Sequence, residues 1–571
     1  MIADVQPSES EDRMEREASA ERERRQNGAR GFSRARTKTE WSARLQPSEW
    51  IPVAVVFACV AAFRVSLIGR GAMAFLDETM YYKAALALDA VRHADVAAAL
   101  NHIASNNGRP GVALLELAPA ALQAIPFALG VPPSNPRSLI LPVAMNAAVT
   151  LVTLYFFWRI SLRLFDGSAA ASLVAGAVYG LLVNSNLYVR HLLAIEPALC
   201  IGMAALWLAV SPSESSWRAA AVGMFAAFSV AVYPGYYLFA LVAIAVLVAL
   251  DSSSSLVDRA QRLLASAAGA MSVILVIAVL CRIGGVNYFA VVRGLGGTVS
   301  QGSFDEGWIF VPRYLVEVER AIGVVLLAGL ATFLVDLARR CLTRPTPNLS
   351  AHHSDLVSDT SDTSDTWVRP VDWVILAAIA AWICQAAASS ITQSMVLYGR
   401  LIHPWMPFLV WATIDTIVRV RSTAVRRALY GVTAAASAWS FVTFAPAYLR
   451  LTYPADALYA LGINSALIPA ADRRCDLESG YEYESPAPLN RRTGAPYSAR
   501  ADYRLVNFCM GAPAPAPPPP DEPPPNMRLR FDAPHFMTFR AYGFEGLTPG
   551  QRDAMVQRGY RLRVYESDAV Q

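Results

Sequence analysis

Long apolar runs, separated by short polar segments, fill most of the chain between residues 50 and 445. A helix needs roughly 20 apolar residues to cross about 30 Å of hydrocarbon, and it satisfies its own backbone hydrogen bonds there. This pattern predicts an all-α polytopic membrane protein. The predicted transmembrane helices number about eleven and cover 51–69, 138–157, 168–186, 191–210, 218–233, 235–250, 263–281, 320–338, 371–391, 401–418 and 426–445.

One further apolar segment, 111–130, contains a glutamate and two prolines, so it either spans the membrane or lies along its surface as a juxtamembrane helix. Short cytoplasmic loops carry an excess of Lys and Arg. If 111–130 does not span and the N-terminus is cytoplasmic, nearly every arginine-rich loop, from 159–163 to 419–427, falls on the cytoplasmic side. We adopt this topology. It places the loop 71–137 and everything after residue 446 outside the cell.

Composition divides the chain further. Hydrophobic residues make up 54% and charged residues only 16%, against about 25% charged residues in soluble domains. Residues 1–49 are rich in Arg and Glu, which predicts a disordered cytoplasmic tail before the transmembrane domain 50–445. The SDT repeats within 345–369 predict a disordered cytoplasmic linker. The polar region 446–571 predicts a small extracytoplasmic domain or a loop-rich appendage, with a stiff proline-rich spacer at 512–525.

The seven cysteines show no metal-ligand spacing. Five lie in or beside apolar segments, which is typical of small buried side chains. Cys475 and Cys509 are the two in the polar C-terminal region. Because an extracytoplasmic compartment is oxidising, we expect a disulfide between them, with two free thiols as the alternative. The net charge of +4 says little about partners, and we expect membrane lipids rather than nucleic acid.

Polar groups at a membrane edge are costly and usually functional, and the first ones on the predicted outer face follow the first span. Asp77 and Glu78 stand in FLDETMYYKAA, where a simple helix N-cap is the alternative explanation. Arg109 stands in NNGRPG, at the start of the juxtamembrane helix. An arginine there opposes the helix dipole, so we expect it to hold an anion such as a phosphate, with a lipid-headgroup anchor as the alternative.

Two further groups lie at the outer ends of later spans. Glu196, in YVRHLLAIEP, sits about one and a half turns inside its span, where a carboxylate needs a partner or a water-filled cavity. Arg190 is a candidate partner, which would make the group structural, and His191 alone is typical of an interfacial residue. Arg400 and His403 stand in LYGRLIHPWMPF, at the outer end of another span. Arg400 is a candidate functional residue, and the alternative is that its side chain only snorkels to the membrane surface. Carboxylates and cations on one face are what glycosyl transfer from a lipid phosphate needs.

In their order, these motifs resemble the GT-C glycosyltransferases, in the branch of the aminoarabinose transferases and protein mannosyltransferases. The segment 77–81 resembles the D-E-T-x-Y signature of the first outer loop, although Met80 replaces a residue that is often basic. Arg-Pro-Gly at 109–111 stands where that branch commonly has Lys-Pro-Pro. Glu196 stands at the second acidic position, and 398–408 resembles the late R-Y-x-x-P-x-x-P segment. The resemblance covers about 75–410.

The resemblance implies transfer of a hexose or pentose from a polyprenyl-phosphate donor to a lipid, glycan or protein acceptor, with inversion. It implies an inner-membrane or plasma-membrane enzyme acting on the outer face. Asp77 would be the general base, and Glu78 and Glu196 would orient acceptor or sugar or bind a cation. Participation of a divalent metal is left open, because members of the family differ. The residues expected to contact substrate or phosphate are Arg109, Arg400, Lys83, Arg190 and His191.

Three other functional classes fit parts of the pattern. A lipid-linked glycan transporter or flippase would explain the many spans, but the polar residues gather on one face, and no internal repeat of the kind many transporters have is obvious. A polysaccharide ligase or polymerase uses lipid-linked donors but does not require the carboxylate pair after the first span. A membrane scaffold would have the C-terminal region as its working part.

Overall fold

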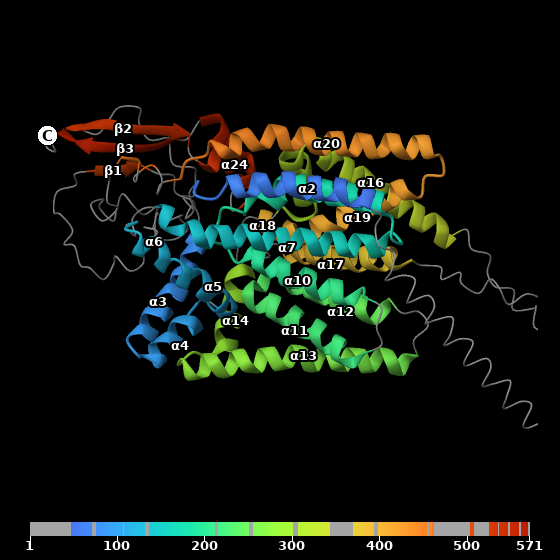
Figure 1. Ribbon diagram of the computed structural model, residues 1–571, viewed down its shortest axis with the longest axis horizontal. Helices are drawn as coiled ribbons and strands as arrows, with labels where there is room; N and C mark the ends of the chain where they lie inside the picture. Colours follow the sequence, from blue (N-terminus) through green and yellow to red (C-terminus); the bar gives the residue numbers. More distant parts are fainter. Residues whose placement is uncertain are drawn as a thin grey trace, which may run out of the picture.

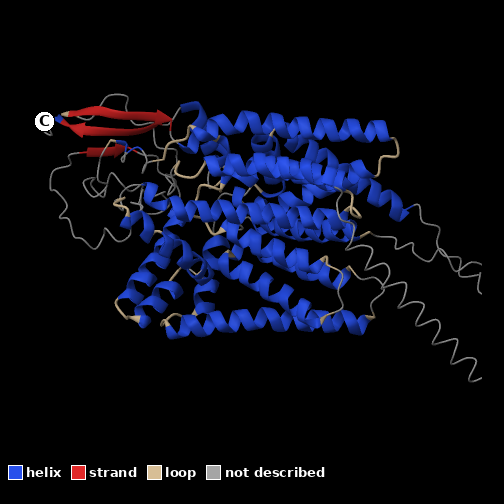
Figure 2. Ribbon diagram, in the orientation of Figure 1, coloured by secondary structure: helices blue, strands red, loops and turns tan. Residues whose placement is uncertain are grey.

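The computed structural model describes residues 47–70, 76–106, 108–131, 136–211, 215–250, 255–300, 306–342, 369–392, 398–453, 457, 460–461, 503–506, 525–534, 536–545, 549–558 and 561–568. Long helices lie side by side along the length of the molecule, and a small sheet stands at one end, which we call the sheet end (Figures 1 and 2). Several predicted segments lie outside the described residues: residues 1–46 of the predicted tail 1–49, most of the linker 345–369, most of the spacer 512–525, and both Cys475 and Cys509. Helix α2 (Pro47–Ser66) includes the last three residues of the predicted tail, which are therefore helical.

The bundle consists of apolar helices. Its members are α2 (Pro47–Ser66), α7 (Ile140–Leu164), α8 (Ala169–Leu181), α10 (Ile195–Ala209), α11 (Ser216–Val232), α12 (Tyr237–Ala249), α13 (Leu256–Ile283), α16 (Ala321–Leu342), α17 (Pro370–Thr392), α19 (Met406–Val418) and α20 (Thr423–Leu449). Shorter elements complete it: α9 (Val183–Leu187), η3 (Pro234–Tyr236), η4 (Gly307–Ile309), α15 (Phe310–Tyr314), the π-helical turn η5 (Leu315–Glu319), α18 (Gly399–Ile402) and η6 (His403–Trp405).

Among the described residues, seven helices are long and apolar enough to cross a membrane, judged by length and composition. Several long apolar helices of this kind indicate a membrane-embedded protein. Each of the eleven segments expected to span coincides with one of these helices or with a shorter apolar helix. The seventh long one is Pro110–Ala128, the segment expected to lie along the membrane surface. Because five of the eleven are shorter than 18 residues, the count of about eleven spans stays a prediction.

Small helices from the first predicted outer loop gather at the sheet end. They are η1 (Leu76–Met80), α3 (Tyr81–Arg92), α4 (Val96–Ala104), α5 (Pro110–Leu122), α6 (Ala124–Ala128) and η2 (Pro136–Leu139), together with α14 (Tyr288–Ser300) (Figure 1). The segment Pro110–Ala128 is divided between α5 and α6, and α5 packs against α3 and α4. This packing accords with a juxtamembrane helix, which remains the prediction.

The C-terminal region contributes a three-stranded antiparallel sheet with the order β1-β3-β2. Its strands are β1 (Tyr503–Val506), β2 (Met527–Pro534) and β3 (Arg561–Ser567), and the helical elements beside them are η9 (Phe536–Thr538), α23 (Arg540–Gly543) and α24 (Pro549–Arg558). The register of β2 on β3 shifts between Leu529 and Phe531. The structure therefore contains a sheet in the predicted C-terminal domain, and whether 446–571 forms an independent domain stays a prediction.

Between α8 and α10 lies the segment 182–194, which we call the buried loop. The short helix α9 forms its first part, the backbone after α9 is irregular, and every residue of the segment is buried. Main-chain groups away from water need hydrogen-bond partners, and side chains from other elements supply them. Asn146 on α7 donates to the carbonyl oxygens of Tyr188, Val189 and His191, at 3.2, 3.0 and 2.9 Å. The Glu319 carboxylate accepts from the backbone N–H groups of residues 183 and 184, at 2.9 and 2.7 Å.

Two more side chains hold the same buried loop from the other side. Arg64 on α2 donates to the Ser185 carbonyl at 3.2 Å and to the Asn186 amide oxygen at 3.1 Å. The hydroxyl of Tyr448 on α20 donates to the Leu187 carbonyl at 2.7 Å. The loop is thereby fixed to helices that lie far from it in the sequence.

Ion pairs close the opposite end of the bundle. Asp372 on α17 and Asp415 on α19 are buried. Arg340 on α16 donates to both carboxylate oxygens of Asp372, at 3.1 and 3.3 Å, and Arg419 donates to Asp372 and Asp415, both at 2.6 Å. Because buried charges are stable only when paired, we interpret this cluster as a clasp that joins three helices.

The buried loop yields a stability prediction. Asn146→Leu keeps the number and branching of the side-chain heavy atoms but removes a donor to three buried carbonyl groups. The Tyr188 carbonyl keeps the backbone N–H of His191 at 3.0 Å, and each carbonyl left unsatisfied costs about 1–3 kcal/mol. We expect a clearly lower Tm in detergent, measured by thermal unfolding of the purified protein. Thr332→Val, which alters an exposed position on α16, is the control. A Tm for Asn146→Leu equal to that of the control would contradict this role of the loop.

Candidate functional site

Asp77 lies at the sheet end, in the short helix η1 that follows α2. Its side chain is 34% exposed. One carboxylate oxygen pairs with the guanidinium of Arg400 on α18, and the other lies 3.9 Å from Nη1 of Arg109. Three residues that are far apart in the sequence, and that the motifs had singled out, therefore meet at one carboxylate.

Glycines fix Arg109 in this position. The turn before α5 closes through a 2.7 Å hydrogen bond from the backbone N–H of Arg109 to the Asn106 carbonyl, and Gly108 adopts a φ of +72° that side-chain-bearing residues rarely adopt. A Cβ on Gly111 would lie 2.8 Å from the Ala231 carbonyl oxygen, so α5 begins directly against the end of α11. The glycines of the NNGRPG motif thus allow the tight turn and the close packing of α5, and the same turn places Arg109 beside Asp77.

The Arg109 guanidinium is only partly paired. It lies over the ring of Tyr233 at 5.3 Å, and its Nη1 is 3.3 Å from the Met80 sulfur. Within the described part of the chain, its buried Nε atom has no hydrogen-bond partner. An unpartnered buried donor is costly, and it marks a position that an anion would complete.

Arg400 has a second carboxylate and an aromatic neighbour. Its Nε donates to Glu545 at 2.8 Å, and its guanidinium lies 5.2 Å from the ring centre of Tyr398. The hydroxyls of Tyr398 and Tyr233 are hydrogen-bonded at 2.8 Å. Two arginine–tyrosine pairs are therefore joined to each other, with Asp77 between the two cations.

Charge decides the protonation of Asp77. Burial alone would raise its pKa, but the positive charges of Arg400 and then Arg109 outweigh burial, and the pKa lies below its ordinary value. The group is thus a carboxylate at neutral pH. A carboxylate with a lowered pKa is a weak base as long as both arginines face it.

Glu78 faces away from Asp77 into the protein. Its fully buried carboxylate accepts from the backbone N–H of Leu192 at 2.9 Å and lies 3.2 Å from Nδ1 of His191. The other ring nitrogen of His191 lies 2.5 Å from the hydroxyl of Tyr542 and 3.2 Å from that of Tyr453. This geometry favours a role for Glu78 and His191 in holding the buried loop, although the sequence predicted catalysis and phosphate contact.

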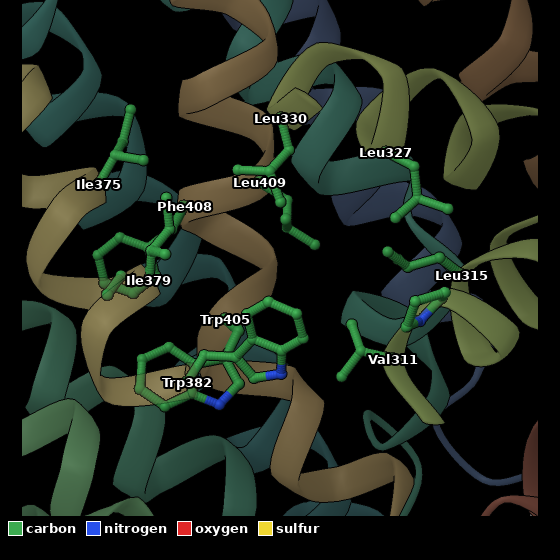
Figure 3. A pocket seen from close by; sticks show the side chains of 12 residues that line it. Val311, Leu315, Leu327, Leu330, Ile375, Ile379, Trp382, Trp405, Phe408 and Leu409 are labelled. Carbon is green, nitrogen blue, oxygen red and sulfur yellow. The ribbon is translucent and has the colours of Figure 1, made fainter. Parts of the chain in front are cut away.

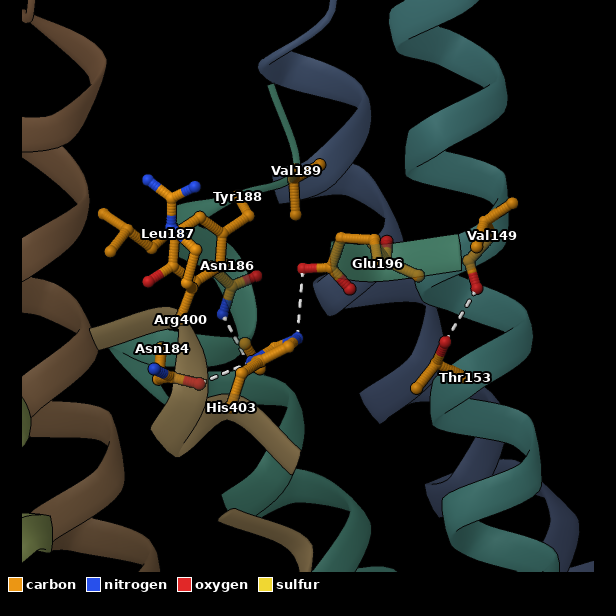
Figure 4. A network of polar contacts seen from close by, with 12 residues as sticks. Val149, Thr153, Asn184, Asn186, Leu187, Tyr188, Val189, Glu196, Arg400 and His403 are labelled. Atoms are coloured by element: carbon orange, nitrogen blue, oxygen red, sulfur yellow. Dashed lines mark hydrogen bonds and ion pairs between the residues drawn. The ribbon is translucent and has the colours of Figure 1, made fainter. Parts of the chain in front are cut away.

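Glu196 lies at the start of α10 and faces His403 (Figure 4). Its carboxylate oxygen is 3.3 Å from Nε2 of His403, an ion-pair distance without hydrogen-bond geometry. Nδ1 of His403 lies 2.5 Å from the Asn184 amide oxygen, and the Asn184 amide donates to the hydroxyl of Tyr314 at 2.6 Å. The partner that the structure shows for this carboxylate is therefore His403, whereas the sequence had offered Arg190.

The remaining predicted phosphate contacts have other neighbours. The guanidinium of Arg190 is fully buried; it donates to the Tyr448 carbonyl at 3.3 Å and lies 4.3 Å from the ring centre of Tyr453. Lys83 on α3 donates to the Ser105 hydroxyl at 3.4 Å. Arg190 thus ties the buried loop to the segment after α20, which favours a structural role. Phosphate contact by Lys83, Arg190 and His191 stays a prediction.

An apolar cavity of about 50 Å³ lies between α16, α17 and α19 and the segment 311–315 (Figure 3). Aliphatic and aromatic side chains line it, among them Trp382, Trp405 and Phe408. Trp405 belongs to η6, directly after the helix that carries Arg400. The apolar cavity therefore borders η6, the helical turn that directly follows α18, the helix of Arg400.

Sequence reasoning missed Glu545, Tyr233 and Tyr398. Glu545 stands in the C-terminal region, where no local motif marks it. The aromatic-rich stretch YPGYY at 233–237, at a predicted outer turn, offers a signal that could have indicated Tyr233. Among the residues that the structure describes, no group of three His, Cys, Asp or Glu side chains is placed to hold a metal ion.

Comparison with known proteins adds no relative: no protein-family model and no curated protein matches the chain. The resemblance to the GT-C glycosyltransferases therefore rests on the short ordered motifs. It stays a prediction, and the geometry at Asp77 is the evidence that bears on function.

The placement of Glu78 yields a second prediction. Glu78→Gln removes the buried negative charge that holds Leu192 and His191, and such charge-assisted hydrogen bonds contribute about 1.5–3 kcal/mol each. We expect a lower Tm, measured by thermal unfolding in detergent. Glu317→Gln is the matched control, because that carboxylate is 27% exposed and its ion pairs are worth little. Equal Tm values for the two variants would exclude an anchoring role for Glu78.

Proposed function

We propose that the protein is a membrane glycosyltransferase that moves a sugar from a polyprenyl-phosphate donor to an acceptor hydroxyl on the extracytoplasmic face. The observation that carries the proposal is the partly exposed Asp77 carboxylate between the guanidinium groups of Arg109 and Arg400. The three groups supply a base and two cations at one point. They lie at the end of an apolar helical bundle, where a lipid-linked donor can reach them.

The phosphate of the donor would bind between Arg109 and Arg400. Guanidinium groups match phosphate oxygens in charge and planar geometry, and the unpartnered Nε of Arg109 supplies a donor without breaking an existing contact. The ring centres of Tyr233 and Tyr398 lie 5.3 and 5.2 Å from the guanidinium carbons of Arg109 and Arg400, and the rings support the two cations. The same cations stabilise the negative charge that develops on the leaving phosphate.

Transfer then proceeds as one displacement. The acceptor hydroxyl oxygen attacks the anomeric carbon and forms the new glycosidic bond. The bond between that carbon and the phosphate oxygen breaks, and its electron pair leaves with the phosphate. The acceptor proton passes to the Asp77 carboxylate. Attack from the face opposite the phosphate inverts the anomeric configuration.

Donor binding also prepares the base. The structure pairs Arg400 with Asp77. A phosphate that takes this arginine releases the carboxylate and neutralises the charges that lower its pKa. Asp77 therefore becomes a stronger base at the moment when the acceptor must be deprotonated.

The predicted topology supplies the setting. The N-terminus would be cytoplasmic, and the C-terminal region and the site would face the outside of an inner or plasma membrane. The apolar cavity beside η6 offers space for part of the donor lipid, and Glu196, held by His403, would orient the sugar or acceptor. The acceptor is a lipid, a glycan or a protein.

Removal of the base gives the first test. Asp77→Asn should lower turnover by about 10²–10⁴-fold, measured as transfer from labelled polyprenyl-phosphate sugars by the purified protein in detergent. Asp89→Asn, the same change on the neighbouring helix α3, should leave turnover unchanged. Normal turnover by Asp77→Asn would exclude it as the base. Donor transport across vesicles without transfer by the wild-type protein would favour the flippase alternative.

The pKa of Asp77 predicts the pH dependence. Its lowered value in the free protein means that kcat/KM, which reports the free enzyme, persists to low pH and falls only below about pH 4, the ordinary range of Asp. In the donor complex the phosphate offsets the arginines, so the pKa rises and kcat falls at a higher pH than kcat/KM. Steady-state kinetics as a function of pH measures where kcat and kcat/KM each fall on the acidic side. If both fall at the same pH, Arg400 does not leave Asp77 for the phosphate when the donor binds.

A further inference from the structure

We propose that Glu545 is a specificity-determining residue, which sets the charge of the anion site so that it favours a ligand with one phosphate charge over a diphosphate. The inference rests on the proposed function for the identity of the site. It concerns a residue of the C-terminal region, to which neither the motifs nor the resemblance assigns a role.

The C-terminal segment 536–545, which we call the hook, is built into the bundle. The hydroxyl of Tyr542 lies 2.5 Å from the His191 ring nitrogen and 2.6 Å from the Tyr453 hydroxyl. The carbonyl of Phe544 accepts from the backbone N–H of Gly399 at 2.8 Å. Tyr542, Phe544 and Glu545 are all buried. The hook is therefore docked beside Arg400 by contacts that do not involve the Glu545 carboxylate.

Glu545 and Asp77 accept hydrogen bonds from different nitrogens of the Arg400 guanidinium. One oxygen of Glu545 accepts from Nε of Arg400 at 2.8 Å, and the other accepts from the hydroxyl of Tyr188. Asp77 accepts from Nη1 of Arg400 and faces Arg109. Two carboxylates thus face two guanidinium groups, and the formal charges of the four cancel.

The two carboxylates differ in what they can do when an anion arrives. Asp77 is 34% exposed and stands at the end of a short helix, so it can release Arg400. Glu545 has no exposed side-chain surface and stays in place with the hook. The bound anion therefore meets two positive charges and one fixed negative charge. Repulsion from Glu545 grows with each negative charge on the ligand.

This fixed charge suits a phosphodiester. With Asp77 ionised as the base, the two arginines and two carboxylates carry no net charge, so a phosphodiester leaves an excess of one negative charge, which the partly exposed Asp77 can share with solvent. A diphosphate would bring excess negative charge into a site with little solvent screening. Specificity arises as much from repulsion of the wrong ligand as from attraction of the right one. On this basis a monophosphate-linked sugar, rather than a diphosphate-linked one, is the donor class that the site selects.

Binding of a matched ligand series to the full-length protein in detergent tests the inference. The probes are methyl geranyl phosphate, geranyl phosphate and geranyl diphosphate, with about one, two and three negative charges at pH 8. Glu545→Gln keeps the shape of the side chain and an oxygen that accepts from Arg400. We expect its gain in affinity over the wild type to grow roughly tenfold with each ligand charge, by titration calorimetry.

Glu317→Gln is the matched control, because it removes an equal charge that pairs with Arg540 of the hook and not with Arg400, whose carboxylate partners are Asp77 and Glu545. It should leave all three affinities at the wild-type values. Equal weakening of the three probes by Glu545→Gln would show that Glu545 only supports the fold, and would overturn the inference. So would a gain that does not depend on ligand charge.

Binding and transfer separate this inference from the proposed function. A charge-dependent gain without any sugar transfer would leave the anion selectivity standing and remove the glycosyltransferase. Sugar transfer with no effect of Glu545→Gln on binding of the mono- and diphosphate probes would leave the glycosyltransferase standing and remove the anion selectivity. Failure of every probe to bind either protein would exclude an anion site at Arg109 and Arg400, and with it both proposals.

Discussion

The buried loop imposes the constraint on which the rest of the structure depends. Its backbone is irregular yet lies inside the bundle, so its N–H and C=O groups need partners that water cannot supply. Side chains from five other elements provide them: Arg64 from α2, Glu78 from η1, Asn146 from α7, Glu319 from η5 and Tyr448 from α20. Each contact fixes one element against the loop, and together they determine where the ends of these elements converge.

The site inherits its geometry from this loop. Glu78 anchors η1 to Leu192, so its neighbour Asp77 is held on the opposite, partly exposed side. Tyr188 leaves the same loop to meet Glu545, and Glu545 in turn holds Arg400. The carboxylate pair that resembles a family signature is thus divided between two tasks. One member secures the backbone, and the other faces the cations.

Hydropathy and charge patterns predicted the helical membrane class and each apolar segment, because burial in a bilayer depends on local composition. They also selected Asp77, Arg109 and Arg400, which do meet. The patterns could not separate Asp77 from Glu78, because two adjacent acids look alike until the fold exposes one and buries the other. Nor could they predict Glu545, because no local motif marks it in the polar C-terminal region and its pairing with Arg400 exists only in the fold.

The two ends of the bundle hold their ion pairs differently. At the clasp, three arginines and three aspartates are interlinked, and the buried Asp372 and Asp415 are each held by two arginines. Such a network gains little from another ion. At the sheet end the formal charges also cancel, but Asp77 is one-third exposed. A buried Nε without a hydrogen-bond partner among the described residues occurs at both ends, on Arg109 here and on Arg340 at the clasp, so the exposed carboxylate is the difference. On the proposed function, this partial exposure is what lets Asp77 give up Arg400 to a phosphate, whereas Asp372 and Asp415 are buried and each held by two arginines.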